Sequence, residues 1–374
     1  MGKARGCYRF ILSFIKLPIL QIYCIFATMN LADIKEIKNL LSPKNGVKNI
    51  VIVSHRNPDG DAYGSSLALY HFLKKKNHEV TVISPNDCPN FLKWLPNQKD
   101  ILLFEPNVAK ATIRLEKADI VFTLDFNALH RTGDKMQIAL EKINPIFIMI
   151  DHHQAPDDYA KYTFSDVKKS STSEMIYDFI EAFAEVDLID KEIATCIYTG
   201  IMTDTGSFRF PSTTSRTHLI TANLLAKGAD NARIYNSVMD NNSYERMQLL
   251  GKALNNMQLI KKLKTAYITL TQKELDRYNF EKGGTEGFVN YALSLRGVVF
   301  ATIFIEDRKQ GIIKMSFRSK GNFSVNEFAR EHFSGGGHTN AAGGRSEDNM
   351  AKTVEKFLKL LPKYKTELEQ SYEI

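Results

Sequence analysis

The chain of 374 residues has four cysteines and no uninterrupted apolar segment of the length that spans a membrane. Its cysteines, Cys7, Cys24, Cys88 and Cys196, form no CxxC pair and no disulfide framework. This pattern argues against a zinc–thiolate site and favours a reducing compartment. We therefore expect a cytoplasmic protein.

The excess of positive charge is small in residues 29–374, because much of it lies in the first 28 residues. The formal net charge is +7 at pH 7. Four of these positive charges lie in residues 1–28, which contain no acid, so that residues 29–374 carry only +3. A balance of this size argues against a long DNA or RNA footprint. Any nucleic-acid ligand is expected to be short and to be held locally.

Residues 1–28 combine a basic start with an apolar stretch that is interrupted by Lys16 and Pro18. This composition is typical of a signal or anchor segment, although its uninterrupted part is short for a membrane span. We interpret residues 1–28 as a dispensable extension, with Met29 as an alternative start. A membrane anchor is the less favoured alternative.

Short apolar runs alternate with amphipathic segments over the first two thirds of the chain. The runs predict strands, and the spacing of apolar residues in the other segments predicts helices. We expect strands over 49–54, 79–84, 119–124 and 145–150, and helices over 32–42, 62–76, 135–142, 171–183, 191–202 and 214–226. Such alternation builds an α/β domain with a doubly wound, mainly parallel sheet and helices on both faces.

The pattern changes after a charged stretch at 242–263, which we interpret as a helix connecting two domains. Beyond it we expect strands over 265–271, 298–306 and 311–317, and helices over 325–332 and 350–361. The strand pair joined by residues 308–310 has the spacing of a hairpin. We therefore expect an N-terminal domain at 29–241 and a smaller mixed α+β domain at 264–374.

Acidic residues and histidines follow three of the predicted strands directly. They are His55 with Asp59 and Asp61 after the first strand, Asp125 after the third, and Asp151-His152-His153 after the fourth. The carboxyl ends of parallel strands meet at one edge of a sheet, where α/β proteins bind their ligands. Carboxylate oxygens and imidazoles gathered there predict a divalent metal site.

The two carboxylates of the first cluster, Asp59 and Asp61, are separated by one glycine. They can diverge in direction and so reach two different metal ions. The alternative is structural: Asp61 is a good N-cap for a helix that begins at Ala62.

Consecutive histidines on a strand-end turn point in different directions. One of His152 and His153 can bind a metal while the other faces the substrate as an acid, and Asp151 can orient an imidazole. The alternative is a polar surface loop with two ordinary histidines.

Asp204, at the end of the predicted helix 191–202, is the remaining candidate ligand. The alternative is that it is one of the polar residues that terminate the helix. Four aspartates balance the charge of two divalent cations. Oxygen-rich ligands with imidazole favour Mn²⁺, with Mg²⁺ as the alternative. Two such ions activate water and clamp the oxygens of a phosphoryl group.

A second signal lies near the C-terminus, where a glycine run precedes His338. The backbone N–H groups of Gly335, Gly336 and Gly337 can point toward one anion and form a binding site for it, called an anion nest. Arg318 can bind a phosphate through two parallel hydrogen bonds. The alternative is a flexible glycine loop.

These motifs, in this order, resemble those of the DHH phosphoesterases, over about residues 30–345. The matching segments are His55-x-x-Pro58-Asp59-Gly60-Asp61, Asp125, Asp151-His152-His153 and Asp204-Thr205-Gly206. The chain departs at Tyr63, where a smaller aliphatic residue is expected, and at Asn127, where serine is common. Neither position is a ligand.

The resemblance implies a role for each residue. One metal ion is held by His55, Asp59 and Asp125, and a second by Asp61, Asp125, His152 and Asp204, so that Asp125 bridges them. His153 is the general acid nearest the leaving oxygen. The C-terminal part resembles the DHH-associated domain, in which Arg318, Ser319, Gly335, Gly336, Gly337 and His338 bind the distant end of the nucleotide.

The combination resembles most the DHH enzymes that degrade short 5′-phosphorylated RNA and remove the 3′-phosphate from adenosine 3′,5′-bisphosphate (pAp). The alternatives are a cyclic or linear dinucleotide phosphodiesterase, a pyrophosphatase, a single-strand exonuclease of the RecJ type, and a nucleotide-binding regulator without catalysis. The glycine run argues against the pyrophosphatase, the charge balance against the exonuclease, and the complete ligand set against the regulator. A homodimer remains open.

Overall fold

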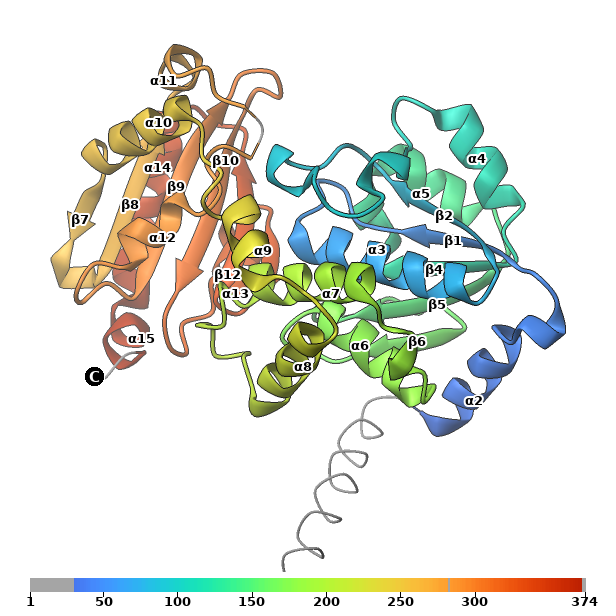
Figure 1. Ribbon diagram of the computed structural model, residues 1–374. Coiled ribbons are helices and arrows are strands. Elements are labelled where there is room, and N and C mark those ends of the chain that lie inside the picture. The colour runs from blue at the N-terminus through green and yellow to red at the C-terminus, as the bar shows by residue number, and fades with distance from the viewer. Residues whose placement is uncertain (1–29, 282, 372–374) are drawn as a thin grey trace, which may run out of the picture. The chain divides into compact units, whose positions relative to one another are not determined.

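The computed structural model of the protein describes residues 30–281 and 283–371. The chain divides into two compact units, with the division after Asp240 (Figure 1). The predictions for residues 1–28 fall outside the described residues. In the part of the chain that is described, no helix is long and apolar enough to cross a membrane. The cytoplasmic location stays a prediction.

The first unit is built from strands that alternate with helices. Its strands are β1 (Asn49–Val53), β2 (Glu79–Ser84), β3 (Leu102–Leu103), β4 (Ile120–Leu124), β5 (Ile146–Asp151) and β6 (Tyr162–Ser165). Its helices are α2 (Leu31–Leu40), α3 (Gly60–Lys75), α4 (Val108–Glu116), α5 (Asp134–Glu141), α6 (Thr172–Ala182), α7 (Lys191–Asp204), α8 (Ser215–Ala226) and α9 (Asn231–Val238).

All the strand pairs of this sheet are parallel, in the order β3-β2-β1-β4-β5-β6. The chain first builds outward from β1 to β3 and then returns to place β4 on the other side of β1. The strand order therefore reverses between β1 and β4, which is the position where doubly wound sheets bind ligands.

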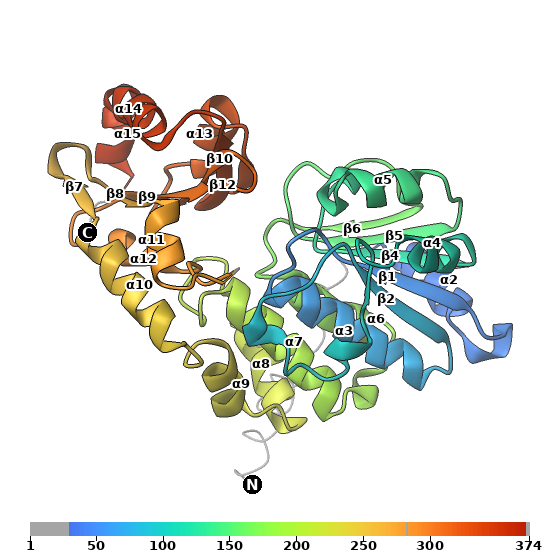
Figure 2. The ribbon, with the colours of Figure 1, turned by 90° about the horizontal axis from the view of Figure 1, so that it is seen from above.

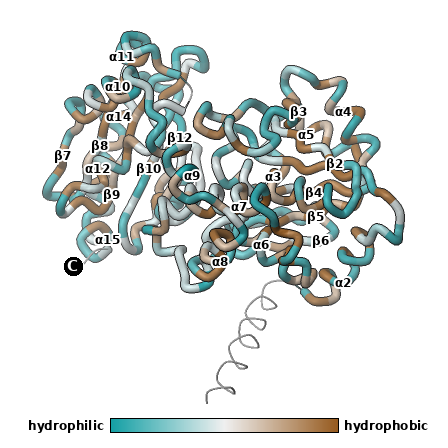
Figure 3. The backbone as a smooth tube through the Cα atoms, in the orientation of Figure 1, coloured by the Kyte–Doolittle hydropathy of each residue, from teal (hydrophilic) through white to brown (hydrophobic). Residues whose placement is uncertain are grey.

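The central strands β1, β4 and β5 bury both of their faces, since successive side chains, which point to opposite sides of the sheet, are buried along them. Ile50 and Ile52 of β1 pack into a core with α3, α6 and α7, whereas Val51 and Val53 pack into a second core with α4 and α5. Figure 2 shows the sheet edge-on between these two groups of helices. The central strands are correspondingly hydrophobic along their length (Figure 3). The predicted fold class is confirmed.

The second unit contains a mixed sheet. Its strands are β7 (Gln258–Ile260), β8 (Thr265–Leu270), β9 (Phe300–Asp307), β10 (Ile312–Ser319), β11 (Gly336–His338) and β12 (Ala341–Ser346). Its helices are α10 (Tyr244–Asn255), α11 (Gln272–Arg277), α12 (Phe288–Leu293), α13 (Val325–His332), α14 (Met350–Leu360) and α15 (Lys365–Gln370). The order is β11-β12-β10-β9-β8-β7, and only the pair β8–β9 is parallel.

Two cores cover the faces of this second sheet. Phe300, Phe317 and Phe328 belong to an aromatic core with α14, whereas Ile303 packs on the other face with α10, α11 and α12. The expected hairpin is β9–β10. The helix expected over 242–263 is shorter than predicted, because α10 ends at Asn255 and the next residues form the edge strand β7. The short edge strands β3, β6 and β11 were not anticipated.

Candidate active site

The carboxyl ends of β1, β4 and β5 bring the predicted ligands of the first unit together. His55 follows β1, Asp125 follows β4, and His152 follows β5. Since β4 pairs with both β1 and β5, Asp125 lies between the two histidines. The position is the one at which the strand order reverses.

Asp125 turns one carboxylate oxygen toward each histidine. Its Oδ2 lies 3.4 Å from Nε2 of His55, and its Oδ1 lies 3.5 Å from Nε2 of His152. His55 is also 3.9 Å from Oδ1 of Asp59. Asp125 has a φ of +65°, a left-handed conformation that a non-glycine residue adopts only at an energetic cost. With one oxygen on each side, the carboxylate of Asp125 could contact two metal ions at once.

Asp61 and Asp204 approach the same histidine from helices α3 and α7. Nε2 of His152 lies 3.8 Å from Oδ2 of Asp61 and 3.4 Å from Oδ2 of Asp204. The two helices pack closely at Gly64. A Cβ on this residue would lie 2.6 Å from the carbonyl oxygen of Cys196, so a larger residue would not fit there. The glycine therefore allows the approach that joins the two aspartates, which are far apart in the sequence.

Helix termini hold two of the aspartates in place. Asp59, rather than Asp61, is the N-cap of α3, and its Oδ1 accepts hydrogen bonds from the amides of Asp61 and Ala62 at 3.1 Å. Helix α3 begins at Gly60, two residues earlier than predicted, which corrects the capping alternative for Asp61. The carboxylate of Asp61 instead accepts hydrogen bonds from the first amides of α6, those of Thr172 at 2.6 Å and Ser173 at 2.8 Å.

The cluster has a deficit of positive charge. Burial raises the pKa of Asp61 well above its usual value, and the charges of Asp125 and Asp204 raise it further. Burial and the neighbouring carboxylates raise the pKa of Asp204 to about 7, although His152 opposes this shift. Burial also raises the pKa of Asp125, but hydrogen bonds with His152 and His55 outweigh it, so that this pKa is lowered. Divalent cations would supply the missing charge. The ligand atoms of His55, Asp59 and Asp125 lie within 4.8 Å of one another, and so do those of Asp61, Asp125 and His152, so that each group could hold an ion.

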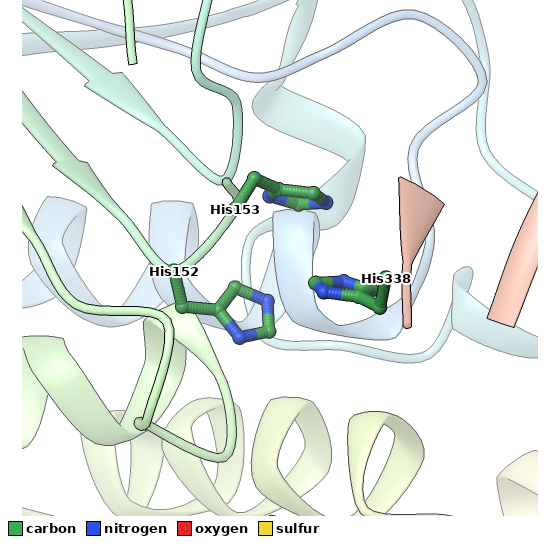
Figure 4. Close-up of side chains that lie close together, drawn as sticks. All are labelled: His152, His153 and His338. Carbon is green, nitrogen blue, oxygen red and sulfur yellow. The ribbon is translucent and has the colours of Figure 1, made fainter. Parts of the chain in front are cut away.

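His152 and His153 leave the end of β5 in different directions (Figure 4). Their ring planes are inclined by 72°, and their centroids lie 5.0 Å apart. Nδ1 of His153 lies 2.7 Å from Oδ1 of Asp151, whose side chain is fully buried. A carboxylate oxygen accepts, so Nδ1 donates, and Nε2 is then the nitrogen through which His153 can exchange a proton. Asp151 therefore orients His153.

His152 is oriented by a backbone carbonyl that the sequence alone does not indicate. Its Nδ1 lies 3.2 Å from the carbonyl oxygen of Lys169, which leaves Nε2 to face the aspartates. The Lys169 ammonium is held by Asp178 at 2.6 Å, and Arg216 of α8 bonds the other oxygen of Asp178, also at 2.6 Å. This ion network, in which the Asp178 carboxylate is buried and both cations are partly buried, fixes the segment that carries the carbonyl.

The hydroxyl of Thr172 donates to Oδ1 of Asp125 at 3.1 Å, so the start of α6 supports both buried aspartates. A sequence signal for this position does exist. Ser171 and Glu174 stand three residues apart, which is the spacing of a capping box, and Ser171 is the N-cap of α6. The signal predicts where the helix begins but does not predict that its first turn reaches the site.

The second unit places Arg318 and His338 at one level of its sheet. Arg318 of β10 pairs with Ala341 of β12, and Ala341 pairs in turn with His338 of β11. Residues directly opposite each other in antiparallel strands project to the same face. Arg318 and His338 therefore project from the same face of the sheet, two strands apart, and together can bind an anionic group.

The glycine run differs from the predicted anion nest. Gly336 and His338 lie in a strand, and the amides of Gly335 and Gly337 already donate to Ala329 O at 3.2 Å and to Asn326 Oδ1 at 2.9 Å. Glycine is needed because a Cβ on Gly335 would lie 2.0 Å from the carbonyl oxygen of Gly343. The run therefore allows a close approach of β11 to β12, rather than converging amides.

Ser319 is buried, and its hydroxyl takes part in two internal hydrogen bonds, donating to Phe323 O at 2.6 Å and accepting from Asn340 Nδ2 at 2.9 Å. It supports the turn beside Arg318. Its contact with a substrate stays a prediction.

The fold and site define a doubly wound α/β protein with a cluster of carboxylates and histidines, suited to divalent metal ions, at the switch point of its parallel sheet. Residues 49–201 match the model of the DHH family N-terminal domain, and residues 261–367 match the DHHA1 domain. The chain belongs to the DHH family of phosphoesterases and is an enzyme of this family.

Individual relatives extend over most of the chain. A probable bifunctional oligoribonuclease and PAP phosphatase NrnA from Streptococcus mutans is 30% identical over 83% of this chain and 93% of its own length. A bifunctional oligoribonuclease and PAP phosphatase NrnA from Thermus thermophilus is 31% identical over 79% of this chain and 83% of its own. The crystal structure of an exopolyphosphatase-related protein from Bacteroides fragilis is 42% identical, covers 92% of this chain and 99% of its own, and has a TM-score of 0.87.

Proposed function

We propose that the protein hydrolyses short 5′-phosphorylated oligoribonucleotides to mononucleotides and converts pAp to AMP. The observation that carries the proposal is Asp125, whose two oxygens face His55 and His152 on either side. This arrangement fits a site for two ions that acts on one phosphate. The activities in the names of the two NrnA relatives support the same substrates.

We assign His55, Asp59 and Asp125 to one ion, and Asp61, Asp125, His152 and Asp204 to the other, with Mn²⁺ favoured over Mg²⁺. When bound, the pair would supply an activated water and neutralise charge on the phosphate oxygens. The residues of the chain hold the ligand atoms in place. Asp61 is fixed by the first turn of α6, and His152 by the carbonyl of Lys169.

His153 is assigned as the general acid. Asp151 holds its Nδ1, so that Nε2 carries the proton that passes to the leaving ribose oxygen. In the second unit, Arg318 and His338 are assigned to a phosphate of the nucleotide that is not cleaved. A guanidinium binds phosphate through two parallel hydrogen bonds, which suits this positioning role.

The test is a turnover panel with Mn²⁺ on pAp, pApA, a five-nucleotide RNA and pyrophosphate, with EDTA as the metal-free control. We expect mononucleotides from pApA and the RNA and AMP from pAp, with no turnover of pyrophosphate. The absence of turnover on both pApA and pAp would refute the proposal.

The assignment of Arg318 is tested by its substitution with alanine. Loss of a phosphate contact should raise KM for pApA and change kcat little. The matched control is Arg308→Ala, because Arg308 is 68% exposed and lies in the turn between β9 and β10, before the end of β10 that is opposite to Arg318. A fall in kcat alone would show that Arg318 acts in the transition state instead.

A further inference from the structure

One residue beside the candidate ligands, Thr172, contacts two of them without being a ligand in the assignments above. Thr172 is the first residue of helix α6, and its side chain is fully buried. Its backbone amide donates a hydrogen bond to Oδ2 of Asp61 at 2.6 Å, and its hydroxyl donates one to Oδ1 of Asp125 at 3.1 Å. A single residue therefore holds one oxygen of each of two buried aspartates.

The two oxygens that Thr172 contacts face the same histidine. Oδ2 of Asp61 and Oδ1 of Asp125 lie 3.8 Å and 3.5 Å from Nε2 of His152. The other oxygen of Asp125, Oδ2, lies 3.4 Å from Nε2 of His55 instead. Both hydrogen bonds of Thr172 therefore act on one side of the cluster, the side of His152.

Asp61 is fixed by the start of α6 through both of its oxygens. The first amides of a helix have no partner within it, and here those of Thr172 and Ser173 donate to Oδ2 and Oδ1 of Asp61. A Cβ on Gly200 would lie 2.7 Å from Oδ1 of Asp61 and 1.9 Å from Oγ of Ser173. The glycine of α7 therefore leaves the space that this contact needs.

The ligands on the side of His55 are held in a different way. Oδ1 of Asp59 accepts hydrogen bonds from the amides of Asp61 and Ala62, and Nδ1 of His55 lies 3.0 Å from the carbonyl oxygen of Arg56. These supports belong to the chain segment that carries the ligands themselves. Asp61, whose side chain is 1% exposed against 48% for Asp59, instead depends on a helix that starts 111 residues further along the chain.

The hydroxyl of Thr172 limits how the carboxylate of Asp125 can be oriented. Each carboxylate oxygen has two lone pairs, and the hydrogen bond from Thr172 uses one lone pair of Oδ1. The carboxylate is thereby held in place before an ion binds. Hydrogen bonds to ligating carboxylates have this effect in metal sites generally, and their loss costs about 10- to 100-fold in metal affinity.

We propose that Thr172 is a positioning residue for one of the two ions and not for the other. The ion that it serves is the one assigned to Asp61, Asp125, His152 and Asp204. The proposal rests on the proposed function, since it takes the assignment of two ions from there. One ion site thus depends on the first turn of α6, whereas the site of His55 and Asp59 depends on its own loop.

The test measures Mn²⁺ binding, by electron paramagnetic resonance of the free ion, in two variants that each weaken one site. In Asp59→Asn the remaining strong site is the one that Thr172 supports, and adding Thr172→Val should weaken its binding about 10- to 100-fold. In Asp204→Asn the remaining site is that of His55, and adding Thr172→Val should change its Kd less than about threefold. Equal weakening in both variants, or none in either, would overturn the proposal.

Two controls separate the hydroxyl from the shape of the side chain. Thr172→Ser keeps the hydroxyl and should bind Mn²⁺ within about threefold of its parent, whereas a loss as large as that of Thr172→Val would contradict the proposal. The matched control is Thr221→Val in α8, because Thr221 is also buried but donates to the carbonyl oxygen of Thr217 at 2.8 Å. Thr172→Ala removes the same hydroxyl and replaces Thr172→Val if the valine variant does not fold.

These outcomes are distinct from failure of the proposed function, because the titrations need no turnover. If the wild type binds two Mn²⁺ ions but hydrolyses neither pApA nor pAp, the nucleotide substrates are wrong, and the effect of Thr172→Val on one ion can still be measured. A wild type that binds fewer than two Mn²⁺ ions would overturn the role of Thr172, whether or not it hydrolyses pAp.

Discussion

The substitution Asp151→Asn tests whether His153 protonates the leaving oxygen. Oδ1 of Asp151 lies 2.7 Å from Nδ1 of His153, while its Oδ2 is buried and has no hydrogen-bond partner among the described residues. An asparagine has two orientations there. With its oxygen toward Nδ1, it buries an unpartnered NH₂ group, which costs about 1–3 kcal/mol. With its NH₂ toward Nδ1, it makes Nδ1 an acceptor, so that the imidazolium, which carries a proton on both nitrogens and is the form that acts as the acid, loses its stabilising partner.

The magnitude follows from the role of an orienting group. General acid catalysis contributes about 100- to 10,000-fold, which sets the range expected for His153→Ala. Loss of a carboxylate that orients an imidazole costs about 10- to 100-fold. This corresponds to about 1.4–2.7 kcal/mol of transition-state stabilisation. We therefore expect kcat of Asp151→Asn on pAp to fall about 10- to 100-fold.

The assay compares two leaving groups. The ribose oxygen of pAp needs a proton to leave, whereas p-nitrophenolate leaves without one. Both Asp151→Asn and His153→Ala should therefore lose far more activity on pAp than on bis(p-nitrophenyl) phosphate. The matched control is Asp158→Asn, the same change at an exposed aspartate of the same loop. Equal losses on the two substrates would refute the reasoning.

Other consequences follow from the cluster and its supports. Asp125→Ala should lower kcat at least about 1000-fold, because each of its oxygens faces a different histidine; near-normal turnover with Mn²⁺ would contradict the bridging role. EDTA should lower the melting temperature in calorimetry relative to Mn²⁺, since an ion at 100 times its Kd stabilises by about 2.7 kcal/mol. Asp178→Ala should cost about 3–5 kcal/mol in urea unfolding, because the partly buried cations of Lys169 and Arg216 lose the buried carboxylate that they share. Burial raises the pKa of Glu274, but hydrogen bonds from Asn256 and Thr271 lower it to about 2. Its stabilising effect is present above pH 4.5 and is lost as the pH falls toward 2, so Glu274→Gln should flatten that part of the stability profile.

Much of the first unit could be predicted from local pattern. Apolar runs such as 145–150 are unambiguous because both faces of β5 are buried. Strand β2 and helix α13 have the predicted bounds, 79–84 and 325–332. Short edge strands could not be predicted in this way. Strand β11 contains only glycines and a histidine, and its pairing with β12 depends on backbone approach rather than on apolar side chains.

The sequence by itself determined the types of the candidate ligands, their order along the chain, and the strand ends that carry His55, Asp125 and His152. These follow from local composition, because a buried parallel strand must be apolar and its end is where polar groups appear. The sequence also identified the family through the order of the motifs.

Only the tertiary structure decided which of these groups lie together and what holds each of them in place. The close packing of α3 on α7 brings Asp204 beside His152, and the first turn of α6 holds Asp61. Such relations depend on distances between segments far apart in the chain, and no local pattern of residues encodes them.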